Sequence, residues 1–369
     1  MNDYFLIIGS GISGSVFAER IANKLKKEVV VVEKRSHIGG NCFDFIDKND
    51  ILIPLYGPHL FHTNDKKIFD YISRFTDWVK YEHRVLSYVD GKLIPIPVSI
   101  KTINILFNMN LKTEKEMKKF LSKQTLKIKN PKNFEELALK TFGKKIYKLI
   151  FKNYTIKQWK KDPKLLDLSI LKRLPIRYNF DDRYFTDTYQ YMPKQGYTKI
   201  FENILNNKKI KVILNTNFNK LSKNIIKNAK KIIFTGPIDE YYKYKFGRLE
   251  YRGLKFVFET KKKEYYQPVA QVNYPNNFKY TRITEPKHCY KYPTFKKTTI
   301  IKEYPSKTNY PKEKYYPMFT KENQEKYQKY KTIKNDKTIF VGRLAQYRYF
   351  NMDQAFKNAL DMFDYYLFN

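Results

Sequence analysis

Cysteine is scarce in this sequence, and long apolar runs are missing from it. The chain of 369 residues carries two cysteines, Cys42 and Cys289, which are too few for a framework of disulfides. We therefore expect both to be reduced thiols. No run of about 18 apolar residues occurs, and no basic-then-apolar leader precedes Tyr4. We expect a soluble, cytoplasmic protein that is neither exported nor inserted into a membrane.

Acidic residues are few relative to basic ones. Asp and Glu number 36 against 72 Lys and Arg, which gives a formal net charge of +36. One explanation is a protein that binds nucleic acid or an acidic membrane surface. The other is a genome biased toward A and T, since the chain is also rich in Asn, Ile, Tyr and Phe. Lysines are scattered along the whole length and their densest runs are short, so we favour the second explanation and expect no nucleic-acid partner.

The stretch FLIIGSGISGSVF (residues 5–17) places the spacing G-x-G-x-x-G between two apolar segments. Its first residues predict a short buried strand, and the residues after the glycines recur with helical spacing. Gly9, Gly11 and Gly14 match a dinucleotide-binding turn, in which a helix N-terminus offers N–H groups to a pyrophosphate. Many turns between a strand and a helix carry glycines without binding anything, so this pattern alone is weak evidence.

A second strand and a second pair of glycines strengthen the prediction. EVVVVEKR predicts a buried strand ending near Glu33, an acid that lies about twenty residues beyond the glycines, where the fingerprint has a ribose-binding carboxylate. A plain surface charge is the alternative for Glu33. The stretch EKRSHIGG then adds the spacing E-x-R-x-x-x-G-G, with Gly39 and Gly40. The two motifs together are more specific than three glycines, and they indicate FAD rather than NAD.

The rest of the chain predicts a discontinuous nucleotide-binding domain. RVLSYVDGKLIPIPV predicts a hairpin that turns at Asp90-Gly91. Residues 100–174 have helical spacing, whereas LKFVFE, VAQVNY and TTIIKEY predict a mostly antiparallel sheet. KIIFTG and KTIFVGR each end at a glycine, which indicates parallel strands returning to the first domain, and the segment beginning at Met352 predicts a helix that covers it.

A series of motifs along the whole chain resembles the UDP-galactopyranose mutase family. In order, they are GSGISG, EKRSHIGGN, YGPHLFHT, NYTIKQW, FTGPID, EYRGLKF, YTRI, KEYP, YYP and GRLAQYRY. That family converts UDP-galactopyranose into UDP-galactofuranose without net redox change. The resemblance implies that N5 of reduced FAD attacks the anomeric carbon while UDP leaves and later returns. Because the nucleophile belongs to the cofactor, no Ser/His/Asp triad is needed.

The resemblance also implies an α/β architecture in three parts, and a homodimer is expected. The parts are a Rossmann-like FAD-binding domain at residues 1–80, 200–245 and 330–369, a helical insert at 98–175 with a substrate loop near 160–177 that moves, and an antiparallel sheet domain at 81–97, 176–199 and 246–329.

The motif YGPHLFHT carries two histidines, His59 and His62. The spacing H-x-x-H occurs in metal sites, but no other His or Cys lies near in the sequence, so we predict no metal. The other alternative is that a histidine is simply buried in the core. That alternative explains one of these two histidines more easily than both. The resemblance implies that His62 lies against the flavin near N5, while His59 lines the sugar pocket.

Arg173 and Arg282 are the candidates for binding the pyrophosphate. A guanidinium matches phosphate oxygens bidentately and stays charged. In so basic a chain, a single arginine is more often a solvated surface charge. Position favours these two, because Arg173 lies in the Pro-punctuated segment where the family has a mobile arginine, and Arg282 ends the YTR stretch.

Further side chains are assigned by matching the motifs of the family. The substrate contacts that the resemblance implies are Phe151, Tyr154, Trp159, Tyr184, Asn273, Tyr315 or Tyr316 or both, and Tyr349. The predicted FAD contacts are Gly9, Gly11, Gly14, Glu33, Arg35, Gly40, Asn41, Gly342, Arg343 and Met352. Core packing is the alternative for each aromatic residue.

Three departures from the family leave the substrate open. Asn153 stands where bacterial members usually have glycine, and Phe350 and Asn351 stand where they often have Tyr and Asp. YQYMPKQGY also differs from the usual filling of that loop. N-acetylgalactosamine or another pyranose, and another base, therefore remain alternatives. Two other functions also remain: an FAD-dependent oxidoreductase, which would consume an electron acceptor, and a nucleic-acid-binding protein, which would bind in a salt-sensitive manner and be colourless.

Overall fold

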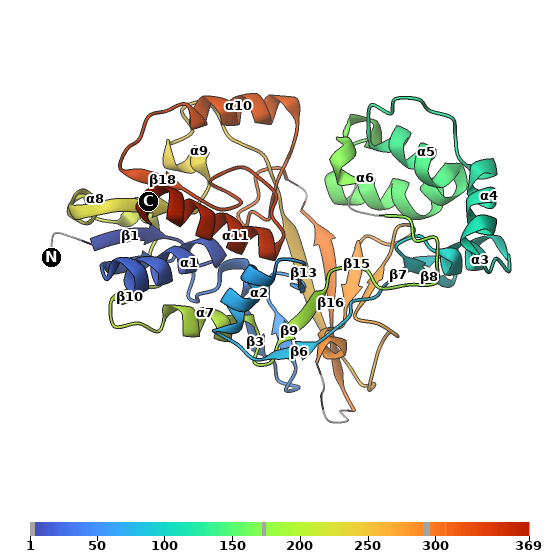
Figure 1. Cartoon of the computed structure of the whole chain (residues 1–369), viewed down its shortest axis with the longest axis horizontal. Coiled ribbons are helices and arrows are strands. Elements are labelled where there is room, and N and C mark those ends of the chain that lie inside the picture. The colour runs from blue at the N-terminus through green and yellow to red at the C-terminus, as the bar shows by residue number, and fades with distance from the viewer. Residues whose placement is uncertain (1–3, 172–174, 291, 293–295, 307, 369) are drawn as a thin grey trace. The chain divides into compact units, whose positions relative to one another are not determined.

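The computed structural model describes residues 4–171, 175–290, 292, 296–306 and 308–368. The chain divides into two compact units, which are described separately here (Figure 1). The first unit comprises Met1–Tyr81, Asp187–Gly253 and Thr308–Asn369, and the second comprises Glu82–Thr186 and Leu254–Lys307. Tyr81 and residues 187–199, 246–253 and 308–329, which the sequence assigns to the sheet domain, lie in the first unit. The helical insert and most of the antiparallel sheet share the second.

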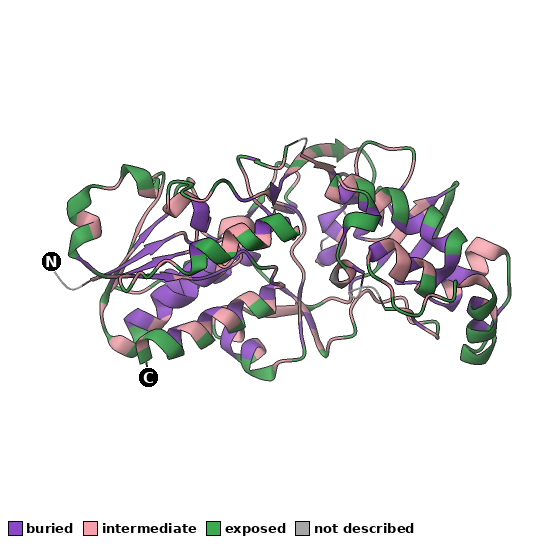
Figure 2. Cartoon of the chain, turned by 90° about the horizontal axis from the view of Figure 1, so that it is seen from above, coloured by how far each residue is buried: buried purple, intermediate pink, exposed green. Residues whose placement is uncertain are grey.

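A parallel sheet forms the centre of the first unit. Its strand order is β10 (Ile210–Ile213), β2 (Glu28–Val32), β1 (Tyr4–Ile8), β11 (Ala229–Phe234) and β18 (Thr338–Phe340). The predicted returning strands are thereby confirmed, since β11 and β18 run parallel to β1. These strands are apolar because both faces of a parallel sheet are covered, and Figure 2 shows them as mostly buried. Helices α1 (Ile12–Arg20) and α11 (Met352–Phe363) pack on each other beside the sheet (Figure 1).

A small antiparallel sheet in the same unit carries one of the predicted histidines. Its order is β5 (Phe61–Thr63), β9 (Tyr189–Pro193) and β6 (Trp78–Lys80), and His62 is paired with Gln190. The remaining elements of the unit are β3 (Asp44–Ile46), β4 (Leu52–Pro54), β12 (Tyr251–Arg252), β17 (Tyr316–Pro317), α2 (Lys66–Ser73), α7 (Tyr197–Leu205), α8 (Lys223–Asn228), α9 (Ile238–Tyr241) and α10 (Lys321–Lys331).

The second unit combines a sheet with a group of helices. The strand order is β13 (Leu254–Lys261), β16 (Thr298–Pro305), β15 (Arg282–Thr284), β14 (Gln271–Asn273), β7 (Val85–Val89) and β8 (Lys92–Ile96). All neighbouring strands pair antiparallel except β14 and β7, which are parallel. The prediction of a mostly antiparallel sheet is confirmed. The turn between β7 and β8 is confirmed at Asp90 and Gly91, whose φ angles of 47° and 80° suit a tight hairpin.

Helices α3 (Ile100–Phe107), α4 (Glu114–Gln124), α5 (Phe134–Ile146) and α6 (Asn153–Trp159) pack on this sheet around one apolar core. A π-helical segment, Tyr147–Lys152, joins α5 to α6. The helical spacing of this region is interrupted at Gly143, which has a φ of 80°. A Cβ at Gly143 would lie 2.4 Å from the Gln124 carbonyl oxygen, so only glycine fits between α5 and the end of α4.

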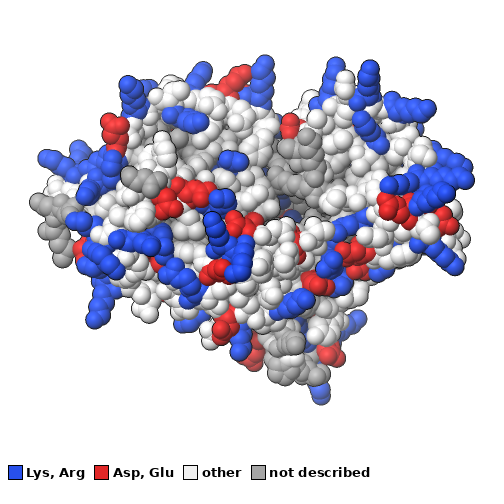
Figure 3. Space-filling view, viewed as in Figure 1, with Lys and Arg blue, Asp and Glu red and all other residues white. Residues whose placement is uncertain are grey.

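The surface of the molecule reflects its basic composition. On the face in Figure 3, Lys and Arg side chains are spread widely and acidic side chains lie among them. None of the helices in the described part of the chain is both long enough and apolar enough to span a bilayer.

Candidate functional site

The turn between β1 and α1 contains the glycines that the sequence indicated. Gly9 has a φ of +101°, and a Cβ there would lie 2.1 Å from Thr235 Oγ1. A Cβ on Gly14 would lie 1.9 Å from the Gly9 carbonyl oxygen, because α1 packs directly on the turn. Gly11 differs, since among the described residues its Cβ would meet only Gly40 Cα, at an ordinary 3.7 Å. Packing within the chain therefore requires two of these glycines but does not require Gly11.

Two stretches of bare backbone meet at the N-terminus of α1. Gly11 is the N-cap and supplies no side chain to the N–H groups of the first turn. Those donors and the helix dipole together favour an anion. The second glycine pair lies against this turn: Gly39 N–H donates to the Ser10 carbonyl oxygen at 3.0 Å, and a Cβ on Gly40 would lie 2.9 Å from Gly11 Cα. This arrangement fits the pyrophosphate of a dinucleotide.

Glu33 lies beside the same turn and is 5 % exposed. Its Oε2 accepts hydrogen bonds from the backbone N–H and the hydroxyl of Ser10, each at 2.9 Å, and its Oε1 accepts one from Arg35 N–H at 3.0 Å. Arg35 Nη2 donates to Asn41 Oδ1 at 2.9 Å and forms an ion pair with Glu313. Arg35 Nε is buried without a hydrogen-bond partner among the described residues. A bound ligand with an acceptor at this point would satisfy that donor.

His62 is held by a carboxylate that sequence reasoning missed. Its Nδ1 lies 2.9 Å from Asp187 Oδ2. The other oxygen of Asp187 accepts a hydrogen bond from Asn64 Nδ2 at 3.0 Å. The hydrogen bond from His62 is the main cause that lowers the pKa of Asp187. Because a carboxylate oxygen only accepts, His62 Nδ1 carries a proton directed at Asp187, and this contact fixes the orientation of the ring. No signal in the sequence connects these residues, which are 125 positions apart.

His59 is partly buried and is kept neutral. Its Nδ1 lies 3.0 Å from the Gly57 carbonyl oxygen; since a carbonyl only accepts, Nδ1 carries the proton. Burial, with the Arg343 charge as the second cause, lowers the pKa of His59 to about 4. The ring also lies edge-on to Tyr197, at 6.3 Å between centroids. At neutral pH, His59 therefore presents Nε2 as an acceptor.

Arg343 is surrounded by segments that meet after β18. Its Nη1 donates to the Tyr315 carbonyl oxygen at 3.1 Å and its Nη2 to the Phe350 carbonyl oxygen at 2.6 Å. Its guanidinium lies 5.0 Å from the ring centroid of Tyr316 and 5.3 Å from that of Tyr349. These two tyrosine rings stack at 5.5 Å. Three predicted residues, Arg343, Tyr316 and Tyr349, thus form one cationic aromatic cluster.

The same region bears on the choice between Tyr315 and Tyr316. Tyr315 is 5 % exposed, and burial raises its pKa, whereas Tyr316 lies partly exposed in the stacked pair. Of the two tyrosines, Tyr316 is therefore the one whose side chain keeps surface for contact with a ligand. Sequence reasoning passed over Arg252, whose guanidinium lies 4.9 Å from the Tyr316 centroid and which is 8 % exposed. The signal was present, because Arg252 lies within the motif EYRGLKF.

Two further residues predicted to contact FAD, Gly342 and Met352, follow β18 and begin α11, respectively. Gly342 has a φ of +94°, and a Cβ there would lie 2.8 Å from Ser13 Oγ on α1. Met352 is the first residue of α11 and is 9 % exposed. The strand end after β18 and the start of α1 are therefore in contact, as two loops that border one nucleotide would be.

In the second unit, Asn273 and Arg282 are paired in register across β14 and β15. Arg282 Nε lies 3.0 Å from Oε2 of Glu303, which is 3 % exposed, and its Nη1 lies 3.4 Å from Gln271 Oε1. Gln271 Nε2 also donates to Asn273 Oδ1 at 3.0 Å. The charge of Arg282 is therefore balanced by a buried carboxylate, in addition to any role toward phosphate.

The aromatic candidates of the second unit differ in exposure. Phe151 is 4 % exposed and stacks on Phe142 at 4.5 Å, within the apolar core. Tyr154 and Trp159 lie on α6 and are partly exposed. Tyr184 is partly exposed, and its N–H donates to the His83 carbonyl oxygen at 2.7 Å. Arg173 lies outside the described residues.

Comparison with known proteins agrees with the motifs. A family model described as UDP-galactopyranose mutase matches residues 149–349, and a model of an NAD(P)-binding Rossmann-like domain matches residues 7–75. A protein of Klebsiella pneumoniae described as a probable UDP-galactopyranose mutase is 36% identical over 99% of this chain and 95% of that protein. The chain belongs to the UDP-galactopyranose mutase family. It is therefore an isomerase with a Rossmann-like dinucleotide-binding domain, and the predicted α/β fold is confirmed.

Other relatives show that similarity alone does not decide the substrate. A dTDP-fucopyranose mutase of Escherichia coli is 35% identical, covering 99% of this chain and 98% of that protein. A crystal structure of a reduced UDP-galactopyranose mutase has a TM-score of 0.77 at 18% identity, over 99% and 95% of the two chains. A redesigned putrescine oxidase has a TM-score of 0.57 at 12% identity, over 97% of each chain. The structural likenesses show a shared fold, which does not by itself determine the reaction.

Proposed function

We propose that this chain interconverts the pyranose and furanose forms of a UDP-sugar with the help of reduced FAD, and that UDP-galactopyranose is the first substrate to test. Family membership supports the mutase chemistry. The main observation that supports a bound dinucleotide cofactor is the pair Gly11 and Gly40. Their backbones meet without side chains at the N-terminus of α1, although packing within the chain does not require a glycine at position 11.

Reduced FAD, when bound, would supply the nucleophile for the anomeric carbon. In the first unit, the N–H groups at the start of α1 bind the pyrophosphate and Glu33 accepts from a ribose hydroxyl. His62 is oriented by Asp187, and neutral His59 presents Nε2 as an acceptor. The cluster of Arg343, Tyr316 and Tyr349 supplies positive charge and hydroxyl donors.

The second unit supplies groups suited to the nucleotide. Arg282 offers a charge-assisted contact to a diphosphate, and Tyr154 offers an aromatic face to a base. Because the anomeric C–O bond breaks before the furanose forms, the diphosphate must be retained through the reaction. Arg173 is proposed for the same task on sequence grounds. A homodimer also stays a prediction.

Similarity to relatives does not decide the sugar and the base of the substrate, because the dTDP-fucopyranose mutase is about as similar to this chain as the probable UDP-galactopyranose mutase is. Both are therefore tested by experiment. The test incubates the purified protein, reduced with a small amount of dithionite, with UDP-galactopyranose, UDP-N-acetylgalactosamine and dTDP-fucopyranose in parallel. Chromatography then detects the furanose product. We expect turnover of UDP-galactopyranose with many product molecules per reducing equivalent. A colourless protein without affinity for FAD would refute the proposal.

An FAD-dependent oxidoreductase is the second candidate, because the fold shared with the putrescine oxidase is compatible with that chemistry although it does not determine the reaction. The same assay separates the two reactions. A mutase regenerates its reduced cofactor in each cycle, whereas an oxidase or dehydrogenase consumes one electron acceptor for each product molecule.

A further inference from the structure

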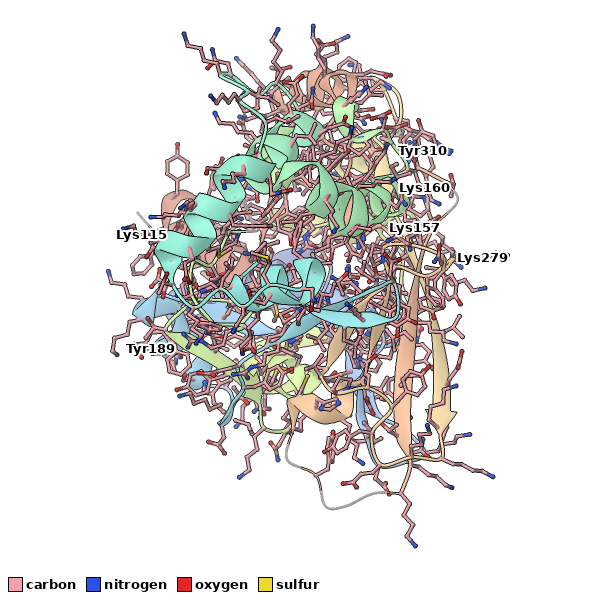
Figure 4. The ribbon with its side chains drawn as sticks, turned by 90° about the vertical axis from the view of Figure 1, so that its right-hand side faces the viewer. Lys115, Lys157, Lys160, Tyr189, Lys279 and Tyr310 are labelled. Atoms are coloured by element: carbon pink, nitrogen blue, oxygen red, sulfur yellow. The ribbon has the colours of Figure 1, made fainter. Side chains whose placement is uncertain are left out.

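Lys157 joins α6 to the hairpin loop between β14 and β15. Its ammonium donates to three backbone carbonyl oxygens of that loop, those of Phe278 and Tyr280 at 3.1 Å each and that of Tyr274. Figure 4 labels Lys157 and Lys160 of this helix region and Lys279 of the loop. The lysine lies three residues after Tyr154, on the helix proposed to meet the base of the nucleotide.

The geometry uses the full donor capacity of the side chain. An ammonium has three N–H donors, and each is matched by one carbonyl of the loop. The three hydrogen-bond acceptors of Lys157 are carbonyl oxygens. Burial, with the nearby Lys160 as the second cause, lowers the pKa of Lys157 to about 8. A half-buried charge is tolerated only where hydrogen bonds replace its hydration. Removing the ammonium would leave three carbonyl oxygens to find new donors.

A second polar clip joins the same loop to the start of α6 and to the π-helical segment before it. Asn276 Nδ2, at the tip of the loop, donates to the Leu149 carbonyl oxygen at 2.9 Å. Asn153 Nδ2, at the start of α6, donates to Asn276 Oδ1 at 2.8 Å. Asn153 is one of the departures from the family pattern, because bacterial members usually have glycine at this position. The departure therefore adds a contact to the loop.

The loop that these contacts hold has candidate substrate residues at both ends. Asn273 is the last residue of β14 and Arg282 is the first of β15, and the two are register partners. A shift of the loop would move both side chains relative to Tyr154 on α6. A charge-assisted contact to phosphate weakens sharply with such a shift, because it depends on distance and direction.

We propose that Lys157 is a positioning residue of the nucleotide-binding face, which holds the hairpin of Asn273 and Arg282 in place against the helix of Tyr154. The inference rests on the proposed function, since it assigns these residues to the nucleotide of the substrate. It predicts that loss of the ammonium weakens nucleotide binding while cofactor binding in the first unit is unchanged.

The test compares Lys157→Met with Lys152→Met in the FAD-loaded protein. Lys152 precedes α6, is exposed, and carries the same charge, so the control removes one positive charge without removing the hydrogen bonds of Lys157. For Lys157→Met we expect at least a tenfold rise in the dissociation constant of UDP, measured by calorimetry, and a matching rise in KM. The kcat and the FAD content should change little, whereas the temperature of unfolding falls because three carbonyl oxygens lose their donor. Lys152→Met should stay within about twofold of the wild type in UDP affinity.

Two further variants keep the inference open to refutation. Lys157→Arg retains the charge, but the N–H donors of its planar guanidinium point in other directions, so we expect a UDP affinity between those of the wild type and Lys157→Met. If Lys157→Met does not fold, Lys157→Arg is the variant that tests the inference. Asn276→Ala removes the second clip and should weaken UDP binding in the same direction. Unchanged UDP affinity in Lys157→Met, or an equal loss in both lysine variants, would overturn the positioning role. If the wild type neither binds UDP nor turns over a nucleotide-sugar, it is the proposed function that fails.

Discussion

His62 Nδ1 lies 2.9 Å from Asp187 Oδ2, which joins strand β5 to the segment that leads into β9. The pairing of β5 with β9 brings these residues together although they are far apart in the sequence. A carboxylate on one ring nitrogen sets both the tautomer and the orientation of an imidazole. Asp187 is therefore the residue that orients the ring of His62.

Asp187→Ala should lower turnover by about 10-fold to 100-fold, because a histidine free to rotate or change tautomer loses its alignment. FAD content should remain that of the wild type. Asp187→Asn keeps an acceptor oxygen and should retain more activity than Asp187→Ala. Asn64→Ala, which removes the contact to the other carboxylate oxygen, is the matched control and should have a small effect. The measurement is kcat with the ratio of flavin to protein absorbance, and wild-type turnover in Asp187→Ala would contradict the prediction.

Gly11→Ala should bind FAD poorly while the protein stays folded. A Cβ at position 11 meets only ordinary van der Waals contact in the chain itself, and the helix cap loses on the order of 1 kcal/mol. A pyrophosphate on the same backbone would be displaced. Gly14→Ala is the contrasting variant, since its Cβ would lie 1.9 Å from the Gly9 carbonyl oxygen, and we expect loss of stability there. Thermal unfolding and flavin absorbance of both variants are the measurements. Normal FAD content in Gly11→Ala would argue against a dinucleotide at this turn.

The stability of the flavin-free protein should fall on acidification because of His59. Its folded pKa is lowered to about 4, whereas an unfolded histidine titrates near about 6.5. Between these values the unfolded chain binds more protons, so stability is lost as the pH falls through this window. We expect about 1 to 2 kcal/mol of loss between pH 7.5 and pH 5 from this residue. Urea unfolding of the wild type and of His59→Gln at both pH values checks this, and an unaltered pH dependence in the variant would contradict it.

Arg282→Ala should lose stability as well as nucleotide affinity. The substitution leaves the carboxylate of Glu303, 3 % exposed, without its ion-pair partner at 3.0 Å. Removing one partner of a buried pair costs on the order of 3 kcal/mol. The double variant Arg282→Met with Glu303→Gln should regain much of that stability, since Thr281 still donates to the amide oxygen that replaces its carboxylate acceptor. It should not regain UDP affinity. If affinity returned with stability, the assignment of Arg282 to phosphate would be wrong.

Local order was the part of this protein that its sequence predicted well. Apolar runs and glycine spacing predicted β1, α1 and β2, and the Asp90-Gly91 turn predicted the hairpin of β7 and β8. Periodicity succeeds for such segments because residues that share one strand or helix face are close in the sequence. The motifs extended the prediction to the family, because each groups side chains that one reaction needs.

The tertiary structure decided what depends on contacts between distant segments. Helical spacing did not predict that α5 is interrupted at Gly143, where the Gln124 carbonyl of the preceding helix leaves no room for a side chain. Periodicity also could not show that Phe151 stacks inside the core, that Tyr316 rather than Tyr315 stacks with Tyr349, or that Lys157 faces three carbonyls of a loop over a hundred residues away. Residue type and spacing determine which side chains are able to act, but sheet register and helix packing determine which of them meet. Those depend on the whole chain burying its apolar surface at once.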